Sequence, residues 1–233
     1  MATQLLDIGL KRDELQRNLG GGLPTGAIAL IEGNDGGGKS IVAQRIAYAL
    51  LKNGHTASYV STELGLGGFL QQMDSLDYRI TDKIISEELV FISMFPQLGN
   101  VKLKKTFMND LLKSKKIFGS EVIVFDTISF LVVSEDLGTE GIFKLIAFIK
   151  KIVSMGKTLI MCIDPEQCNP KFLNIIRNIS EIYLQTESKM VLGNLLHVMN
   201  VIRFRKAKKE VTNATPFKVV PGAGFAIELA SLA

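Results

Sequence analysis

The sequence predicts an α/β protein with a mostly parallel sheet, to which the C-terminal part of the chain adds antiparallel strands at one edge. Three observations lead to this fold class. Strand-like apolar runs alternate with helical segments between residues 27 and 164, a glycine-rich turn joins the first strand to the first helix, and beyond residue 180 strands follow one another without long helices. Such alternation is typical of a parallel sheet covered by helices on both faces.

The composition indicates one globular unit. The 233 residues are 47% hydrophobic and 21% charged, with a formal net charge of +4. This length is enough for one well-buried domain and short for two, so we expect residues 1–233 to form a single domain. The mild positive charge argues against a dedicated nucleic-acid-binding surface.

The longest apolar run, 122–133, is interrupted by Asp126 and too short to span a bilayer. Two cysteines, Cys162 and Cys168, form no disulfide framework, which predicts a reducing, cytoplasmic setting.

The first half of the sheet comes from apolar runs that alternate with helical segments. Residues 27–33 are predicted to form the first strand. Residues 39–54 are predicted to form a helix, because their apolar residues are spaced by three and four and Gly54 provides a C-terminal stop. The next expected elements are a strand at 56–62, a helix at 67–76 and a strand at 89–94.

A lysine-rich segment, 101–118, precedes the second half of the sheet. Its apolar residues recur at helical spacing, so it is interpreted as an amphipathic surface helix whose lysines face solvent; docking on an acidic partner is the alternative. The elements expected after it are a strand at 121–129, a helix at 139–156, a strand at 158–164, and strands within EIYLQTE, NLLHVMNVIRFRKAK, FKVVPG and GFAIEL.

The turn between the first strand and the first helix fits the phosphate-binding pattern G-x-x-x-x-G-K-[ST] in full. Its residues are Gly33, Asn34, Asp35, Gly36, Gly37, Gly38, Lys39 and Ser40. Glycines allow successive backbone N–H groups to point at phosphate oxygens, and the first helical turn, through Ile41, adds its free N–H groups and positive dipole end. Lys39 is predicted to reach the β- and γ-phosphates, and the Ser40 hydroxyl to bind Mg²⁺. The alternative is a flexible glycine turn without a ligand.

Carboxylates at strand ends supply the rest of a nucleotide site. Asp126 ends the apolar run VIVFD and is expected to hold the water shell of Mg²⁺. Glu63 follows the strand after the phosphate loop and is the candidate to orient or deprotonate water; the alternative is an ordinary surface glutamate. Asp164 and Glu166, which end another strand, are further candidates for sensing the γ-phosphate. His55 and His197 are isolated, and no Cys/His spacing suggests a metal site.

These motifs together resemble one family. The segment LGGGLPTGAIALIEGNDGGGKS (19–40) is similar to GGGLPxGxxxLIxGxxGxGKS of the KaiC-like branch of RecA-superfamily ATPases, and DELQRNLGGG (13–22) is similar to the segment that precedes it. YVSTE, VIVFD and the late basic strand VIRFRK follow in the family's order. The resemblance implies a RecA-like P-loop NTPase fold over nearly the whole chain, with ATP and Mg²⁺ as ligands.

The resemblance also implies how the site works. KaiC-like proteins usually carry two adjacent glutamates after the second strand, the first acting as catalytic base; here Glu63 fills the first position and Leu64 the second, which predicts slow or absent hydrolysis. A late strand commonly bears Lys-x-Arg, which reaches the γ-phosphate of a neighbouring subunit. Arg203 and Arg205 occupy these positions and keep the charge, which implies a homo-hexameric ring with ATP between subunits. A solvated basic edge strand is the alternative.

Within this branch, the chain resembles the single-domain accessory ATPases of the archaeal flagellum, the archaellum. This implies a regulatory ATP-binding subunit that docks on a motor ATPase and meets the inner face of the membrane only through its partners. A RecA-like DNA-dependent recombination ATPase is the alternative, although no mobile loop rich in basic and aromatic residues follows Asp126, so we expect no nucleic-acid partner. An autophosphorylating kinase would need a Ser or Thr at a subunit interface.

Overall fold

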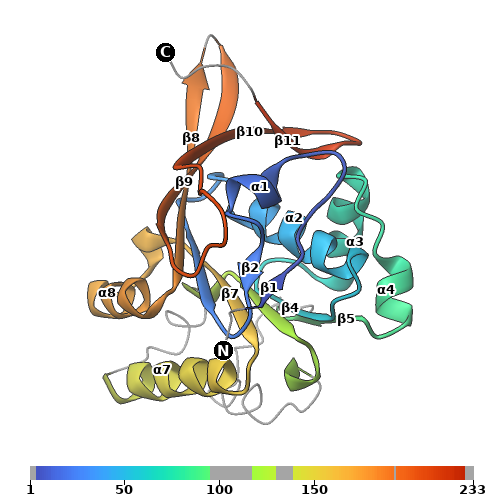
Figure 1. Cartoon of the computed structure of the whole chain (residues 1–233). Helices are drawn as coiled ribbons and strands as arrows, with labels where there is room; N and C mark the ends of the chain where they lie inside the picture. Colours follow the sequence, from blue (N-terminus) through green and yellow to red (C-terminus); the bar gives the residue numbers. More distant parts are fainter. Residues whose placement is uncertain (1–3, 95–116, 130–138, 192, 229–233) are drawn as a thin grey trace, which may run out of the picture.

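A single nine-stranded sheet runs through the part of the chain that the computed structural model describes, residues 4–94, 117–129, 139–191 and 193–228. Its strands are β3 (Ile28–Glu32), β4 (Ala57–Ser61), β5 (Leu89–Ser93), β6 (Val122–Asp126), β7 (Thr158–Ile163), β8 (Ile182–Val191), β9 (Asn194–Phe204), β10 (Ala214–Val220) and β11 (Gly224–Ile227). Their order is β11-β10-β9-β8-β3-β7-β6-β4-β5 (Figure 1). The six strands from β8 to β5 pair in parallel, and β9, β10 and β11 continue the sheet antiparallel from β8. The predicted fold class is confirmed.

Helices cover both faces of the sheet. On one face lie α1 (Leu15–Asn18), α2 (Lys39–Lys52), α3 (Leu66–Ser75) and α4 (Thr81–Ile85), and on the other lie α7 (Thr139–Ser154) and α8 (Pro170–Ile179) (Figure 1). A two-stranded sheet of β1 (Leu5–Leu6) and β2 (Leu23–Pro24) accompanies α1, and the described residues also form two short 3-10 turns, η1 (Ile117–Gly119) and η2 (Pro165–Gln167). Because side chains alternate along each strand, the sheet divides the buried apolar residues into two clusters.

The alternation decides which face each strand residue serves. Ala57 and Tyr59 of β4, and Val122 and Val124 of β6, belong to the cluster that packs under α2. Asp126, two residues beyond Val124, continues the same alternation toward the N-terminus of α2. The register of the two adjacent strands pairs Tyr59 with Val124 and Ser61 with Asp126. The sheet therefore places the end of β6 directly beside the end of β4.

The expected elements differ from the observed ones at their boundaries and in three helices. Of the lysine-rich segment 101–118, residues 101–116 lie outside the described residues, and its last two residues belong to η1. The strand expected at 121–129 ends at Asp126. The short helices α1 and α4 and the longer α8 were not expected; α8 begins with Asn169, whose side chain accepts from the N–H of Lys171, and with Pro170 in its first turn. Both are recognisable helix-start signals.

None of the helices in the described ranges is long and apolar enough to cross a membrane. Both cysteines, Cys162 and Cys168, are buried as free thiols.

Candidate nucleotide-binding site

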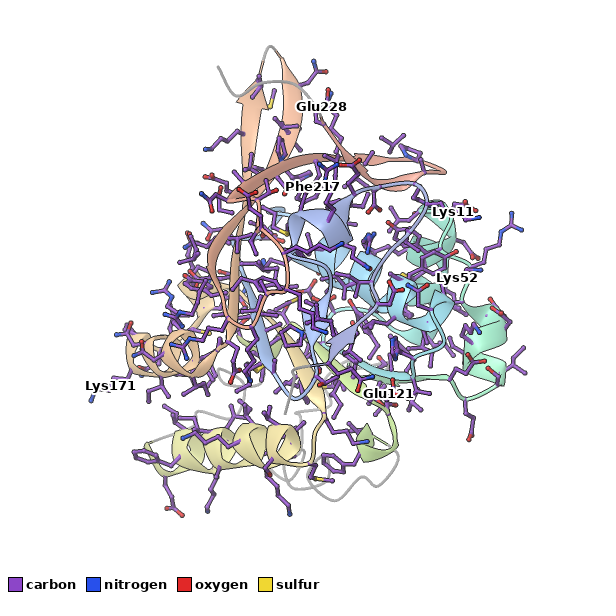
Figure 2. The ribbon with its side chains drawn as sticks, in the orientation of Figure 1. Lys11, Lys52, Glu121, Lys171, Phe217 and Glu228 are labelled. Carbon is purple, nitrogen blue, oxygen red and sulfur yellow. The ribbon has the colours of Figure 1, made fainter. Side chains whose placement is uncertain are left out.

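The glycine-rich loop leads from the end of β3 into α2, at the edge of the sheet where the parallel strands end. Two of its glycines are required by their surroundings. A Cβ on Gly33 would lie 2.4 Å from the Thr186 carbonyl oxygen of β8, and a Cβ on Gly38 would lie 2.9 Å from the ring of Phe217, a buried residue of β10 (labelled in Figure 2). Gly38 also has φ of +93°, which strongly favours glycine. The loop is thus tied closely to β8 and β10.

The N-terminus of α2 faces this loop and is open to a ligand. Gly38 occupies the N-cap position, and no side chain caps the first turn of the helix. The Lys39 side chain is largely buried, and its Nζ donates to the Asn34 carbonyl oxygen at 2.7 Å. Free N–H groups, the positive end of the helix dipole and a lysine ammonium therefore converge on one point, an arrangement that binds phosphate groups well.

Asp126 lies beside the start of α2, held by side chains from two elements. The Ser40 hydroxyl donates to Oδ1 of Asp126 at 2.9 Å, and the Tyr59 hydroxyl donates to Oδ2 at 2.6 Å. Asp126 is nearly inaccessible to solvent, with 5% of its surface exposed. A hydroxyl next to a buried carboxylate supplies the hard oxygen donors that Mg²⁺ prefers, so the residues at this point fit a magnesium ion.

Glu63 follows the end of β4 and lies close to this acidic centre. Its Oε1 accepts a hydrogen bond from the Thr127 hydroxyl at 3.3 Å. The carboxylate reaches solvent, yet the protein around it partly desolvates it, and this desolvation together with the negative charge of Asp126 raises the pKa of Glu63. A carboxylate whose pKa is raised is a better proton acceptor, so the position suits a general base.

Most of the predicted site residues line one cavity of about 180 Å³. Its lining residues are Asp35, Gly36, Gly38, Lys39, Ser40, Ile41, Glu63 and His197. A second cavity of about 470 Å³ adjoins the loop on the side of β8, where Gly33, Asn34, Asp35 and Gly37 share it with Gln185, Glu187 and Asn200. The phosphate loop therefore borders two cavities, and the smaller one holds Lys39, Ser40 and Glu63.

Asp164 and Glu166 also reach the loop region, where both form hydrogen bonds, and their contact with the γ-phosphate stays a prediction. Asp164 caps η2 by accepting from the N–H of Glu166 at 3.0 Å, and the Gln167 amide donates to its other oxygen at 3.3 Å. The Glu166 carboxylate accepts from the Asn34 amide at 2.8 Å. Glu166 thus steadies the tip of the phosphate loop from the end of β7.

Arg203 and Arg205 lie away from the phosphate loop of their own chain. Arg203 donates to the Arg177 carbonyl at 2.6 Å and to the Ser180 carbonyl at 3.1 Å, at the C-terminal end of α8. The N–H of Arg205 donates to the Glu181 carbonyl, beside the first residues of β3, and the Arg205 side chain is exposed. The structure therefore brings Glu63, Asp126 and the loop together but leaves both arginines at the opposite end of the parallel strands.

Several polar residues at the site were not anticipated. Ser188 of β8 donates to the Gly36 carbonyl at 2.8 Å and lies 2.9 Å from Nδ1 of His197, whose ring stacks on Phe217 with centroids 5.1 Å apart. His197 is isolated in sequence but lies against the phosphate loop, and burial lowers its pKa. No sequence signal points to this contact, because the register of β8 and β9 creates it.

Glu32, directly before the loop, is the second unexpected group. It is buried, accepts from Nε of Arg177 at 2.7 Å and also pairs with the Nη2 of that arginine, and it accepts from the Tyr183 hydroxyl at 2.9 Å. Burial opposes its ionisation, but the hydrogen bonds and charge of these partners prevail and lower the pKa of Glu32. A glutamate at the end of an apolar strand hints at such a role, but only the packing of α8 identifies Arg177 as its partner.

Comparison with known proteins agrees with this geometry. The sequence pattern of the family described as "ATPase: KaiC" matches residues 10–229. The archaeal flagellar ATP-binding protein FlaH of Methanocaldococcus jannaschii is 34% identical over 230 residues, which cover 99% of this chain and 98% of that protein. The crystal structure of flagellar accessory protein FlaH from the same organism superposes with a TM-score of 0.90 at 32% identity, covering 97% of this chain and all of that one.

A more distant relative is the DNA repair and recombination protein RadB of Methanosphaera stadtmanae, which is 32% identical over 125 residues, or 52% of this chain and 50% of that protein. The FlaH protein of Methanocaldococcus jannaschii, in contrast, matches along nearly its full length. The order of strands and helices is that of the RecA-like fold. The chain belongs to the KaiC family of ATPases and groups within it with the FlaH proteins.

Proposed function

We propose that residues 1–233 form a single ATP-binding unit that acts as a regulatory subunit of an archaeal flagellar motor and hydrolyses ATP slowly or not at all. The observation that carries this proposal is the cavity shared by Lys39, Ser40 and Glu63, beside Asp126, in a chain similar to FlaH over nearly its whole length. Proteins of this group are named for ATP binding in the archaeal flagellum, and the site has the groups that ATP binding requires.

In this proposal, the N–H groups of the loop and of the first turn of α2, through Ile41, surround the phosphates, and Lys39 moves from the Asn34 carbonyl to the β- and γ-phosphates. Ser40 and Asp126 hold Mg²⁺, which neutralises phosphate charge when bound. These groups can contact one nucleotide because each lies after the end of β3, at the end of β6 or at the start of α2.

We expect hydrolysis to be slow because Glu63, the candidate general base, is followed by Leu64 and not by a second glutamate. We expect Glu63→Gln to lower any ATP turnover roughly 100-fold or more, because general-base catalysis contributes on that order, while the Kd for ATP changes little. Steady-state phosphate release and equilibrium binding of a fluorescent ATP analogue measure the two effects. Unchanged turnover in this variant would remove Glu63 from the reaction.

The same variant has a pH signature. Because the folded protein raises the pKa of Glu63, ionising this carboxyl destabilises the native state, and stability falls as pH rises from the ordinary glutamate pKa through the raised one. Glu63→Gln is therefore expected to have a higher Tm than the parent protein at pH 7. The difference should vanish below about pH 4, where the glutamate is protonated in both states.

Assembly into a ring is the second part of the proposal. ATP with Mg²⁺ is expected to shift the protein toward a hexamer, with Arg205 of one subunit reaching the nucleotide of the next. Arg205→Ala should lose the ATP-dependent shift at unchanged Tm, since its side chain is exposed. Arg203→Ala should instead lower the Tm, since it removes two hydrogen bonds to the end of α8. Light scattering with and without ATP decides this; equal masses under both conditions would contradict it.

The functional role is tested with the partner itself. The purified protein, mixed with the motor ATPase of an archaeal flagellum, is expected to form a complex whose stability depends on ATP and is lost in Lys39→Ala.

The partial match to RadB supports a second candidate, a DNA-dependent recombination ATPase. If single-stranded DNA raises ATP turnover several-fold and no complex with the motor ATPase forms, the recombination role replaces the regulatory one. In the regulatory role, the protein is cytoplasmic and meets the membrane only through the motor complex.

A further inference from the structure

A buried polar cluster lies behind the candidate magnesium site, on the side away from the phosphate loop. Its centre is Tyr59, a β4 residue with no exposed surface, whose hydroxyl donates to Oδ2 of Asp126 at 2.6 Å. The ring is fixed by aromatic neighbours: Phe69 of α3 lies 4.8 Å away and Phe91 of β5 lies 6.3 Å away, measured between ring centroids. The hydroxyl therefore has little freedom to leave the carboxylate.

Oδ2 of Asp126 has Tyr59 as its donor, whereas Oδ1 accepts from two hydroxyls, Ser40 at 2.9 Å and Thr127 at 3.4 Å. Ser40 is the residue expected to bind the metal. If Ser40 turned to a metal ion, Tyr59 would still hold Oδ2 from the side of the protein core. The register pairs Tyr59 with Val124, two residues before Asp126 on the adjacent strand, so the phenol reaches the carboxylate diagonally along the same face of the sheet.

Gln44 completes the cluster and is unusual in having no partner. It lies on α2 one turn after Ser40, is fully buried, and neither the nitrogen nor the oxygen of its amide makes a hydrogen bond in the described part of the chain. The amide approaches the Tyr59 hydroxyl closely enough to interact with it, but not with the distance and angles of a normal hydrogen bond. A buried amide without partners destabilises a protein, so an apolar side chain would serve the core better here. The unpaired amide is thus near Tyr59, the residue that donates to Asp126, and is available for a hydrogen bond in another state of the site.

We propose that Tyr59 positions the Asp126 carboxylate for Mg²⁺, and that Gln44 becomes hydrogen-bonded within this cluster when nucleotide and metal are bound. The inference rests on the proposed function, because it concerns the metal that accompanies the nucleotide. Tyr59 and Gln44 are positioning residues: neither touches the metal or the phosphates. Groups that orient a metal-bound carboxylate in this way commonly affect metal affinity 10- to 100-fold when they are removed.

The test is a Mg²⁺ titration of nucleotide binding, measured with a fluorescent ATP analogue on the full chain. Tyr59→Phe keeps the ring and removes only the hydroxyl. It is expected to raise the Mg²⁺ concentration at half-saturation by about 10-fold, while nucleotide affinity in EDTA stays as in the parent protein. Tyr78→Phe is the matched control. This tyrosine is also fully buried, but its hydroxyl accepts from the N–H of Phe225 and not from any group at the candidate magnesium site. It should lower stability without changing the Mg²⁺ dependence.

Gln44→Met tests the second half of the proposal. Without ligand, this variant is expected to be as stable as the parent protein or more stable, because it removes an unpaired buried amide; with nucleotide, it should need several-fold more Mg²⁺. A loss of stability without ligand, together with an unchanged Mg²⁺ dependence, would overturn the role of Gln44. An unchanged Mg²⁺ dependence in Tyr59→Phe would overturn the role of Tyr59. If the parent protein binds no nucleotide with or without Mg²⁺, the proposed function itself fails instead.

Discussion

Replacing Lys39 by alanine is expected to raise the Kd for ATP roughly 100-fold, since a hydrogen bond to a charged group is worth about 1.5 to 3 kcal/mol and tenfold in Kd is about 1.4 kcal/mol. The ammonium is largely buried at the start of α2 and already pairs with a loop oxygen, so it is held where the phosphates would lie. Isothermal titration calorimetry measures the Kd. A second measure is the Tm gained on adding ATP, which should disappear in the variant.

Lys52→Ala is the matched control for this experiment. Lys52 lies at the other end of the same helix, at the periphery of the molecule (Figure 2), with its Nζ 5.6 Å from the centre of the Tyr48 ring. It carries the same charge but no contact with the loop, so its removal should leave the Kd for ATP unchanged. If Lys39→Ala binds ATP as tightly as the parent protein, the loop does not hold the phosphates and the proposed function falls with it.

The largest effect on stability is expected from Arg45→Met. Arg45 of α2 forms an ion pair with Asp13, through both Nε and Nη2, and its Nη1 donates to the Ile8 carbonyl; neither side chain of the pair has any exposed surface. Removing one partner of a buried ion pair leaves a charge without compensation, which costs about 3 to 5 kcal/mol. We expect urea denaturation to show this loss in the free energy of unfolding.

Two further variants separate the buried charge from other causes. The double variant Arg45→Met with Asp13→Leu removes both charges and is expected to recover much of the lost stability. Arg17→Ala breaks an ion pair with Glu14 in which the two side chains are 78% and 65% exposed, and it should cost less than about 1 kcal/mol. An Arg45→Met variant as stable as Arg17→Ala would show that the buried pair adds little to the fold.

The buried pair also explains part of the sequence resemblance. Asp13 opens the segment DELQRNLGGG, which resembles the KaiC-like pattern before the phosphate loop, yet it does not take part in the site. Its carboxylate holds α2 in place through the buried ion pair with Arg45. A motif shared with nucleotide-binding proteins can therefore serve the position of the phosphate-binding helix rather than the ligand itself.

The sequence by itself determined the parts of this protein that depend on local chemistry. The alternation of strands and helices, the antiparallel C-terminal strands and the start of α2 at Lys39 follow from apolar spacing and glycine placement, although the strand expected at 121–129 ends three residues earlier, at Asp126. Local signals sufficed there because a parallel strand brings its C-terminal residue to the same edge as its neighbours, so a loop and an acidic residue at strand ends must lie close together.

Only the tertiary structure decided the contacts that join distant segments. In the sequence, Tyr59 and Gln44 have no feature that distinguishes them from their neighbours in an apolar strand and an amphipathic helix. Their position near Asp126 depends on the register of β4 with β6 and on the rotation of α2 over the sheet. His197 meets the phosphate loop, and Arg203 the end of α8, for the same reason. Sequence periodicity specifies which face a residue takes, but the partner across that face is set by the packing of elements far apart in the chain.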